Sequence, residues 1–199
     1  MASLKRYLTE LRDPASRVVV SRLTNFSDLS PEDVEEFRKG WPEIDVARRR
    51  EVANRLTELA EDSFELDFDQ VLIACLDDPD GEVRAKAIEG LWYSEEPALI
   101  GAFVRLLAND DVEAVRAAAA TALGQFAYLG EIEELPASDT RRVEQALLAA
   151  FNRVGEAEIV RRRTLEAVGV LTRPVVEDII RQSYQRDNLD FRASALFAM

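Results

Sequence analysis

Apolar and small residues recur at every fourth position through much of the chain, which places them on one stripe of an α-helix. The spacing is clearest in the frame Val-Arg-x-x-Ala-x-x-x-Leu, which begins at Val83 and returns 32 residues later at Val115. Variants of this frame begin at Val160 and Phe191, and a weaker copy surrounds Arg49. Self-similarity of this kind is the sequence signature of a repeat architecture. The copies therefore predict five related helices.

A second amphipathic segment comes before each copy, so each repeat is predicted to be a pair of helices. Helix-start signals such as Ser30-Pro31 and Pro174 accompany these segments. The links within a pair are short and polar, which favours antiparallel hairpins. The preceding helices are predicted at 31–40, 67–77, 96–108, 139–152 and 174–186. The repeats then span approximately 31–61, 67–93, 96–127, 139–171 and 174–199.

Two segments depart from the repeat. Residues 1–25 contain helix candidates at 3–12 and 15–24, and we expect them to cap the first repeat, because terminal repeats need a modified outer face. Residues 128–137 are acidic and contain Gly and Pro, and they predict a surface loop inserted between two repeats. The chain is thus expected to be a single all-α domain over residues 1–199, with about five helix pairs.

The charge of the chain disfavours a nucleic-acid partner. The sequence has 25 basic and 38 acidic residues, a net charge of −13, and such a field repels phosphate backbones. The triplets Arg48-Arg49-Arg50 and Arg161-Arg162-Arg163 imitate a basic surface locally. Glutamates lie between them, however, and partners such as Glu158 for Arg162 predict ordinary solvated pairs on a helix surface.

The residue types present exclude several classes of catalytic and metal site. The sequence has no histidine, which excludes histidine-dependent nucleophiles, bases and metal ligands. The single cysteine, Cys75, lies in an apolar run and is expected to be a buried, inert thiol. The acidic segment 77–82 lacks calcium-loop spacing, because Leu76 and Ala87 occupy two ligand positions. We expect no catalytic residue, no metal and no cofactor.

No stretch of the sequence has the composition of a signal peptide or a membrane span. We therefore expect a cytoplasmic protein with no membrane contact. Basic charge comes from arginine almost throughout, since lysine occurs only at positions 5, 39 and 86. Together with abundant alanine, this composition suggests a bacterial source.

The repeated frame resembles the HEAT-repeat family, particularly its short bacterial branch, the phycobilisome-lyase-type HEAT repeats. The resemblance is closest over residues 67–127, extends over 139–199, and is least evident before residue 66. It implies a right-handed α-α superhelix, the HEAT-like solenoid, in which the second helix of each pair lines the concave side.

The resemblance also implies a ladder of polar contacts between repeats. In this family an acidic residue six positions before the repeated arginine helps to join neighbouring repeats. Asp78 before Arg84 and Asp110 before Arg116 match this rule, and both arginines are expected to contact those loops. Glu43 before Arg49 matches in type, whereas Gly155 and Arg186 occupy the position in the last two repeats. We therefore expect the ladder to weaken toward the C-terminus.

A candidate binding strip follows from the helical wheel of the second helices. Positions opposite the core are expected to line up from repeat to repeat, with Trp92 at the border of the strip, either packed under a neighbouring repeat or available as an anchor. Aromatic and arginine side chains are the anchors that protein interfaces favour. The candidate partner-binding residues are Glu89, Trp92, Tyr93, Thr121, Gln125, Arg162, Arg163 and Glu166.

The functional prediction is a non-catalytic scaffold that binds a protein or peptide along the concave helix face. The alternatives are a HEAT-like enzyme or cofactor-handling protein such as a bilin lyase relative, and a nucleic-acid binder similar to HEAT-like DNA glycosylases. HEAT-like deoxyhypusine hydroxylases use histidine–glutamate iron sites, which this chain cannot form. The apolar residues Leu196, Phe197 and Met199 predict either self-association through the C-terminal edge or repeats that continue beyond residue 199.

Overall fold

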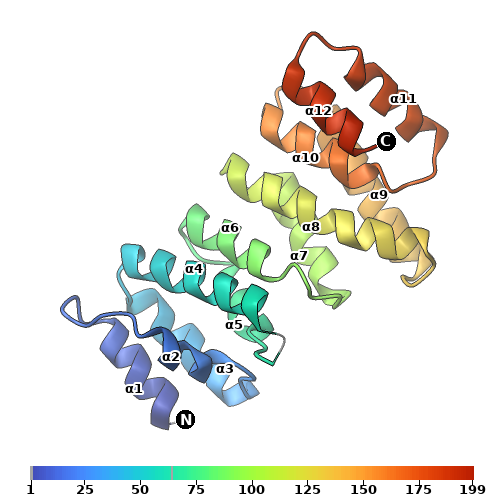
Figure 1. Ribbon diagram of the computed structural model, residues 1–199. Coiled ribbons are helices and arrows are strands. Elements are labelled where there is room, and N and C mark those ends of the chain that lie inside the picture. Colours follow the sequence, from blue (N-terminus) through green and yellow to red (C-terminus); the bar gives the residue numbers. More distant parts are fainter. Residues whose placement is uncertain (1, 64) are drawn as a thin grey trace. The chain divides into compact units, whose positions relative to one another are not determined.

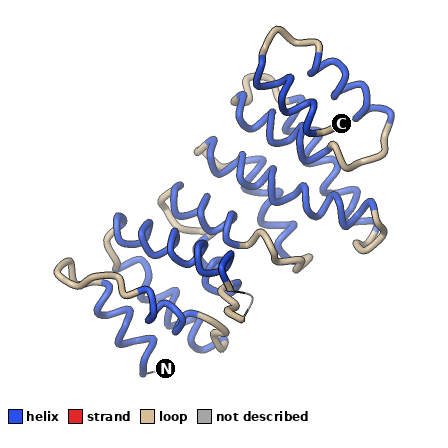
Figure 2. The backbone as a smooth tube through the Cα atoms, viewed as in Figure 1, coloured by secondary structure: helices blue, strands red, loops and turns tan. Residues whose placement is uncertain are grey.

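The protein is seen in a computed structural model that describes residues 2–63 and 65–199. Helices and loops account for all of these residues, and no strand occurs among them (Figure 2). The all-α prediction is confirmed. Two compact units divide the chain after Ser94, and each is described by itself. The prediction of one continuous repeat domain stays a prediction.

The first unit consists of three helix pairs (Figure 1). Helices α2, α4 and α6 pack in sequence as one layer, and α1, α3 and α5 pack as the other. Its helices are α1 (Ala2–Leu11), α2 (Val20–Leu23), α3 (Pro31–Gly40), α4 (Val46–Asp62), α5 (Asp69–Cys75) and α6 (Gly81–Gly90), with the 3-10 turns η1 (Thr24–Phe26) and η2 (Trp41–Glu43). A row of rings fills the core beneath the first pairs, with adjacent centroids 4.9–5.7 Å apart from Tyr7 through Phe26 and Phe37 to Trp41.

The second unit also consists of three helix pairs. Its second helices, α8, α10 and α12, lie side by side, and α7 packs against α9 on the other layer (Figure 1). The helices are α7 (Ala98–Asn109), α8 (Glu113–Glu131), α9 (Ala137–Asn152), α10 (Glu158–Val168), α11 (Pro174–Tyr184) and α12 (Leu189–Phe197). The five predicted pairs are therefore present, and α1 with α2 forms the predicted cap.

Local sequence explains where several of these helices begin. The side chains of Ser30, Asp45, Asp80 and Asn188 each accept a hydrogen bond from a backbone N–H in the first turn of the helix that follows. Such caps satisfy donors that the helix itself leaves unpaired. Two first helices also begin at proline, whose fixed backbone angle suits the first helical position.

The predicted helix at 15–24 is wrong for most of its length, because only Val20–Leu23 is α-helical. Val19 is extended, with φ −102° and ψ 105°. The hydroxyl of Tyr7 donates to the Val19 carbonyl at 3.1 Å and accepts from the Val19 N–H at 3.2 Å. Valine is β-branched and disfavours the helix. The contact with Tyr7 supplies hydrogen-bond partners for the Val19 backbone, which lies outside a helix.

The predicted loop at 128–137 is shorter than expected, because α8 continues through Glu131 and α9 begins at Ala137. Leu129 is buried, so the last turn of α8 still has a core-facing side chain. Gly130 lies so close to Thr140 that a Cβ atom there would be 2.6 Å from the threonine methyl. The packing of α8 against α9 therefore extends into the segment that composition assigned to a loop.

Candidate interaction surface

A buried ion pair joins the first two repeats of the predicted ladder. Asp78 is 4% exposed, and its carboxylate lies 2.9 Å from Nε of Arg49 in the preceding repeat. The same carboxylate accepts from Nε1 of Trp41 at 2.7 Å and from the backbone N–H of Asp80 at 2.8 Å. Arg49 also donates to the carbonyl of Ile44 at 2.6 Å. Asp78 is therefore held by three groups and connects helices α4 and α6 through their loops.

Arg84 and Arg116 donate to the backbone of their own loops. Nη1 of Arg84 lies 2.7 Å from the carbonyl of Asp78, and Nη1 of Arg116 lies 2.8 Å from the carbonyl of Asp110. The predicted contact of these two arginines with their loops is confirmed. Glu43, the acid six positions before Arg49, lies 2.5 Å from Nη1 of Arg12 and so joins the first repeat to the cap.

The ladder was expected to weaken toward the C-terminus, but it does not weaken at the fourth repeat, because the carboxylate there has moved by one residue. Gly155 occupies the expected position, but Glu156 beside it lies 2.8 Å from Nη2 of Arg116 and 2.7 Å from Nη1 of Arg153. Its side chain is 1% exposed. Burial raises the pKa of Glu156, yet hydrogen bonds from Arg116 and from the Ala157 N–H outweigh it, so the pKa lies below its ordinary value.

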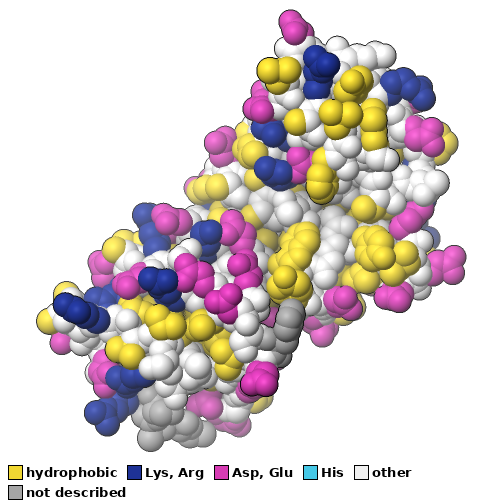
Figure 3. All heavy atoms as spheres, viewed as in Figure 1, with side chains coloured by type: hydrophobic (Ala, Val, Ile, Leu, Met, Phe, Trp, Pro, Cys, Tyr) yellow, Lys and Arg dark blue, Asp and Glu magenta, His cyan; other side chains and the backbone are white. Residues whose placement is uncertain are grey.

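Apart from Arg161, the arginines of the two triplets form ion pairs within and between repeats. Arg50 binds Asp80 with two hydrogen bonds of 2.9 and 2.7 Å, and Arg162 lies 3.1 Å from Asp190. Arg48 and Arg163 pair with acids of their own helices, Glu51 and Glu166. The predicted pair of Glu158 with Arg162 is wrong, because Glu158 instead accepts from the side chain of Asn188 at 3.2 Å. On the face over α1–α6 in Figure 3, basic and acidic side chains are interleaved.

Three predicted site residues lie at the end of α6 in the first unit. Trp92 is 42% exposed and Tyr93 is 56% exposed. Glu89 is exposed and pairs with Lys86 at 2.6 Å. Ala85, on the same face of the helical wheel, is buried, since α4 packs against α6 there.

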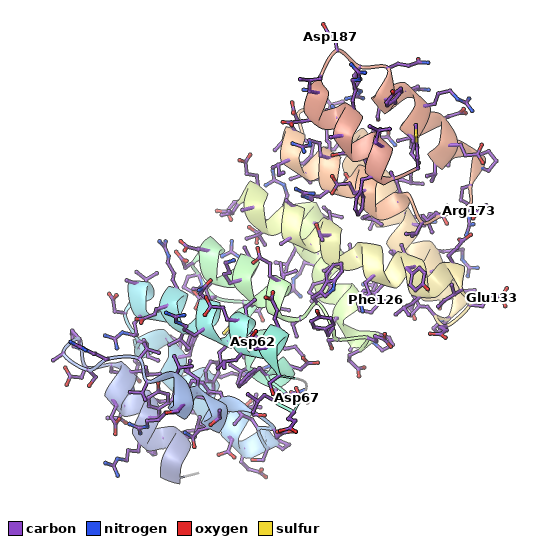
Figure 4. The ribbon with its side chains drawn as sticks, viewed as in Figure 1. Asp62, Asp67, Phe126, Glu133, Arg173 and Asp187 are labelled. Carbon is purple, nitrogen blue, oxygen red and sulfur yellow. The ribbon has the colours of Figure 1, made fainter. Side chains whose placement is uncertain are left out.

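A cavity of about 180 Å³ lies beside Tyr93 within the first unit. Apolar lining comes from Phe68 and Leu72, and Asp67 and Asp69 add carboxylates. The label at Asp67 marks this region in Figure 4. Asp69 accepts a hydrogen bond of 2.5 Å from Oγ of Ser94, which fixes the chain directly after Tyr93. Sequence reasoning missed the carboxylates, because only folding brings the start of α5 next to the end of α6.

The five predicted site residues of the second unit lie on α8 and α10. Thr121 and Gln125 are partly buried on α8, and the Thr121 hydroxyl donates to the carbonyl of Ala117. Arg162 and Glu166 both contact the buried Ser194 of α12, at 3.1 and 2.6 Å. Arg162, Arg163 and Glu166 therefore belong to a network that joins α10 to α12. The sequence gives little indication of this network, because the partners of a serine in an apolar helix cannot be predicted from its position.

The match to a family model falls on the repeats that contain Arg84 and Arg116. The model for HEAT repeats matches residues 70–137. Residues 70–137 of the chain contain HEAT repeats. This agrees with the resemblance inferred from the Val-Arg-x-x-Ala frame, which is closest over residues 67–127.

Two solved structures built of helical repeats resemble this chain in the arrangement of their helices. The complex of CpcE and CpcF of phycocyanin lyase from Nostoc sp. PCC7120 matches with a TM-score of 0.57 and 18% identity, covering 85% of this chain and 99% of that one. A designed armadillo repeat protein matches with a TM-score of 0.46 and 16% identity, covering 98% of each chain. At these identities the likeness to the lyase shows the fold alone. No curated protein sequence matches the chain.

Residues 2–63 and 65–199 offer few groups that could form a reactive or metal-binding site. Cys75 is buried, and burial raises the pKa of its thiol well above the ordinary value. No group of three or more His, Cys, Asp or Glu side chains that could hold a metal ion occurs in this part of the chain. No helix among the same residues is both long enough and apolar enough to cross a membrane.

Proposed function

We propose that this chain is a non-catalytic scaffold that binds a protein or peptide partner on the surface of its second helices. The observation that carries the proposal is the exposed aromatic pair Trp92 and Tyr93 beside an acidic cavity. Aromatic side chains with an apolar body and a polar end dominate the energetics of protein interfaces. Two adjacent ones, 42% and 56% exposed, leave apolar surface that a partner would cover.

The size and lining of the cavity support a macromolecular partner. A volume of about 180 Å³ is below the roughly 300–1,000 Å³ of small-molecule sites. It has room for one side chain inserted from a larger partner. Because Asp67 and Asp69 lie in the lining, a basic side chain is the best electrostatic match.

In the second unit, Thr121 and Gln125 are proposed as partner contacts on α8. Arg162, Arg163 and Glu166 are proposed to contribute at the end of the surface, although their bonds to α12 mean that substitutions there also affect stability. For this reason the test of the function uses the first unit.

The test places a photo-crosslinking amino acid at position 93 in the source organism and identifies the captured protein by mass spectrometry. The affinity of that partner is then measured for Trp92→Ala and Tyr93→Ala. We expect each substitution to weaken binding by at least about tenfold, a loss of about 1.4 kcal/mol or more, without a change in thermal stability. Tyr184→Ala is the matched control, because Tyr184 is 38% exposed on α11, a first helix that carries none of the proposed contacts. Equal affinity of all three variants would refute the assignment.

A lyase-type role is the second candidate, and the fold of the phycocyanin lyase complex favours it. It predicts that the chain binds a bilin or a bilin-carrying protein. Titration of phycocyanobilin, followed by the shift of its absorbance band, tests this role. No spectral change at micromolar protein would leave the scaffold as the better interpretation, whereas saturable binding would favour the lyase-type role.

A further inference from the structure

The last step of the arginine ladder differs chemically from the steps before it. At two earlier steps a carboxylate of the next repeat neutralises the arginine of the repeat before it: Asp78 does so for Arg49 and Glu156 for Arg116. In the last repeat the equivalent position is occupied by Arg186. A carboxylate at this position would neutralise Arg161. Instead, Arg161 lies near a second cation, the guanidinium group of Arg186.

Both cations lie against one aromatic ring in the second unit. The guanidinium carbon of Arg186 is 4.4 Å from the ring centroid of Phe191, and that of Arg161 is 5.6 Å from the same centroid. Arg161 also lies 5.4 Å from the ring of Phe151. The ring of Phe191 is buried, and both arginines are partly buried, so their guanidinium groups are held in place while remaining accessible.

No carboxylate of the described part of the chain forms an ion pair with either arginine. Arg161 uses Nε to donate to the carbonyl of Phe151 at 3.2 Å. Of the nearby acids, Glu158 accepts from the side chain of Asn188, and Asp190 pairs with Arg162. Asp187 is exposed at the loop between α11 and α12, where Figure 4 labels it.

The electrostatics of the pair agree with this geometry. Burial lowers the pKa of Arg186, the charge of Arg161 lowers it further, and Glu158 offsets this only in part. Two like charges that share one ring are stabilised by a bound anion. A guanidinium presents five N–H donors in a planar fork, which suits the two oxygens of a carboxylate or phosphate.

We propose that Arg186 and Arg161 form an oxyanion-binding site, which a carboxylate or phosphate group of the partner occupies in place of the missing ladder carboxylate. The inference rests on the proposed function for the source of the anion, and it adds an acidic group to what the partner must present. The carboxylates at the earlier steps make an acidic side chain the nearest chemical analogue.

The test is an NMR titration of the arginine Nε–Hε signals of the full chain at constant ionic strength. Sodium acetate represents an acidic side chain, inorganic phosphate represents a phosphorylated one, and sodium chloride is the reference. We expect saturable shifts of the Arg161 and Arg186 signals with acetate or phosphate, and the anion that binds more tightly identifies the source. Shifts equal to those with chloride would overturn the proposal.

Two further variants keep the result interpretable. Arg186→Gln should weaken anion binding at least tenfold, whereas Arg181→Gln, at an exposed arginine of α11, should leave it unchanged. Arg186→Glu should restore the ladder carboxylate, abolish anion binding and raise the melting temperature. Unchanged anion binding in both Arg186 variants would overturn the site. Because these probes need no partner, their failure leaves the test at Trp92 and Tyr93 unaffected.

Discussion

At the scale of residues, a single side chain can contact several partners from different helices and loops, as Asp78 does. Asp78 neutralises Arg49, accepts the indole N–H of Trp41 and accepts the backbone N–H of Asp80. Its side chain is 0% exposed, so each bond is made away from water. Removing one partner of a buried ion pair leaves an uncompensated charge, which costs more than the pair itself contributes. The ladder residues should therefore dominate the response to substitution.

Asp78→Asn is expected to lower the free energy of unfolding by about 3–5 kcal/mol, because Arg49 stays charged in a buried position. Urea denaturation followed by circular dichroism measures the loss. Asp187→Asn, at an exposed acid, should change it by no more than about 0.5 kcal/mol. Arg49→Met added to Asp78→Asn should recover part of the loss. A strictly additive double variant would contradict the assigned pair.

Glu156 makes the stability of the protein depend on pH. Its pKa in the folded state is below the ordinary value, because its hydrogen bonds with Arg116 and Ala157 outweigh burial. Its contribution to stability is therefore complete above the pKa of the unfolded chain and is lost as pH falls through the folded value. In Glu156→Gln the urea midpoint should fall less between pH 7 and pH 3 than in the wild type. Glu134→Gln, at an exposed acid, should retain the wild-type slope.

At the scale of elements, Gly124 within α8 and Gly169 at the end of α10 set how closely neighbouring repeats approach. A Cβ atom on Gly124 would lie 3.1 Å from Cβ of Ala167 on α10, and one on Gly169 would lie 2.7 Å from Cα of Ala198 after α12. Gly169 has φ −57°, so alanine would fit its backbone conformation. The glycine is therefore needed for space, which explains its position after the apolar stripe of the repeat.

Gly169→Ala is expected to destabilise the protein by about 1–3 kcal/mol, because the new methyl group meets the backbone of Ala198. Gly101→Ala is the matched control within α7, where the nearest atom is Nη2 of the movable Arg142 side chain at 3.3 Å. Since alanine favours a helix, the control should be stabilising by about 0.5–1 kcal/mol. Thermal unfolding of both variants compares them, and a stabilising Gly169→Ala would contradict the close packing.

At the scale of the whole molecule, exposed apolar side chains and net charge have opposite effects on the association of one copy of the chain with another. Leu196, Phe197 and Met199 are 57%, 80% and 72% exposed on and after α12. Exposed apolar groups of this size favour association. The net charge of −13 opposes it through repulsion between copies. Because salt screens charge without weakening apolar contact, ionic strength separates the two effects.

We expect the 199-residue chain to self-associate through this patch, and more strongly as salt is raised from about 0.05 to 0.5 M. Light scattering coupled to size exclusion measures the mass at each salt concentration. Leu196→Ser with Phe197→Ser should keep the chain monomeric. Val154→Ser is the control, because Val154 is 99% exposed in a loop away from the patch. A wild-type monomer at high salt and high concentration would contradict this prediction.

The sequence by itself determined the helical content, the pairing of helices and the HEAT repeats within residues 70–137, because these depend on periodicity and on local caps. The frame at Val83 and Val115 identified the second helices, and Ser30 and Asp80 act as the caps that their types suggest. The lack of histidine narrowed the possible chemistry as well, because it is a property of composition alone. The helix signals involve residues near each other along the chain, so no distant contact is needed to interpret them.

Only the tertiary structure decided which side chains meet across repeats. A fixed offset of six residues could not find Glu156, since a one-residue shift in a loop moves a carboxylate without altering the helices. The sequence also could not show the hydrogen bonds of Arg162 with Ser194 and of Asp69 with Ser94, because these partners are 32 and 25 positions apart. Helix periodicity fixes the face on which a residue lies, whereas its partner depends on how the next repeat packs against it.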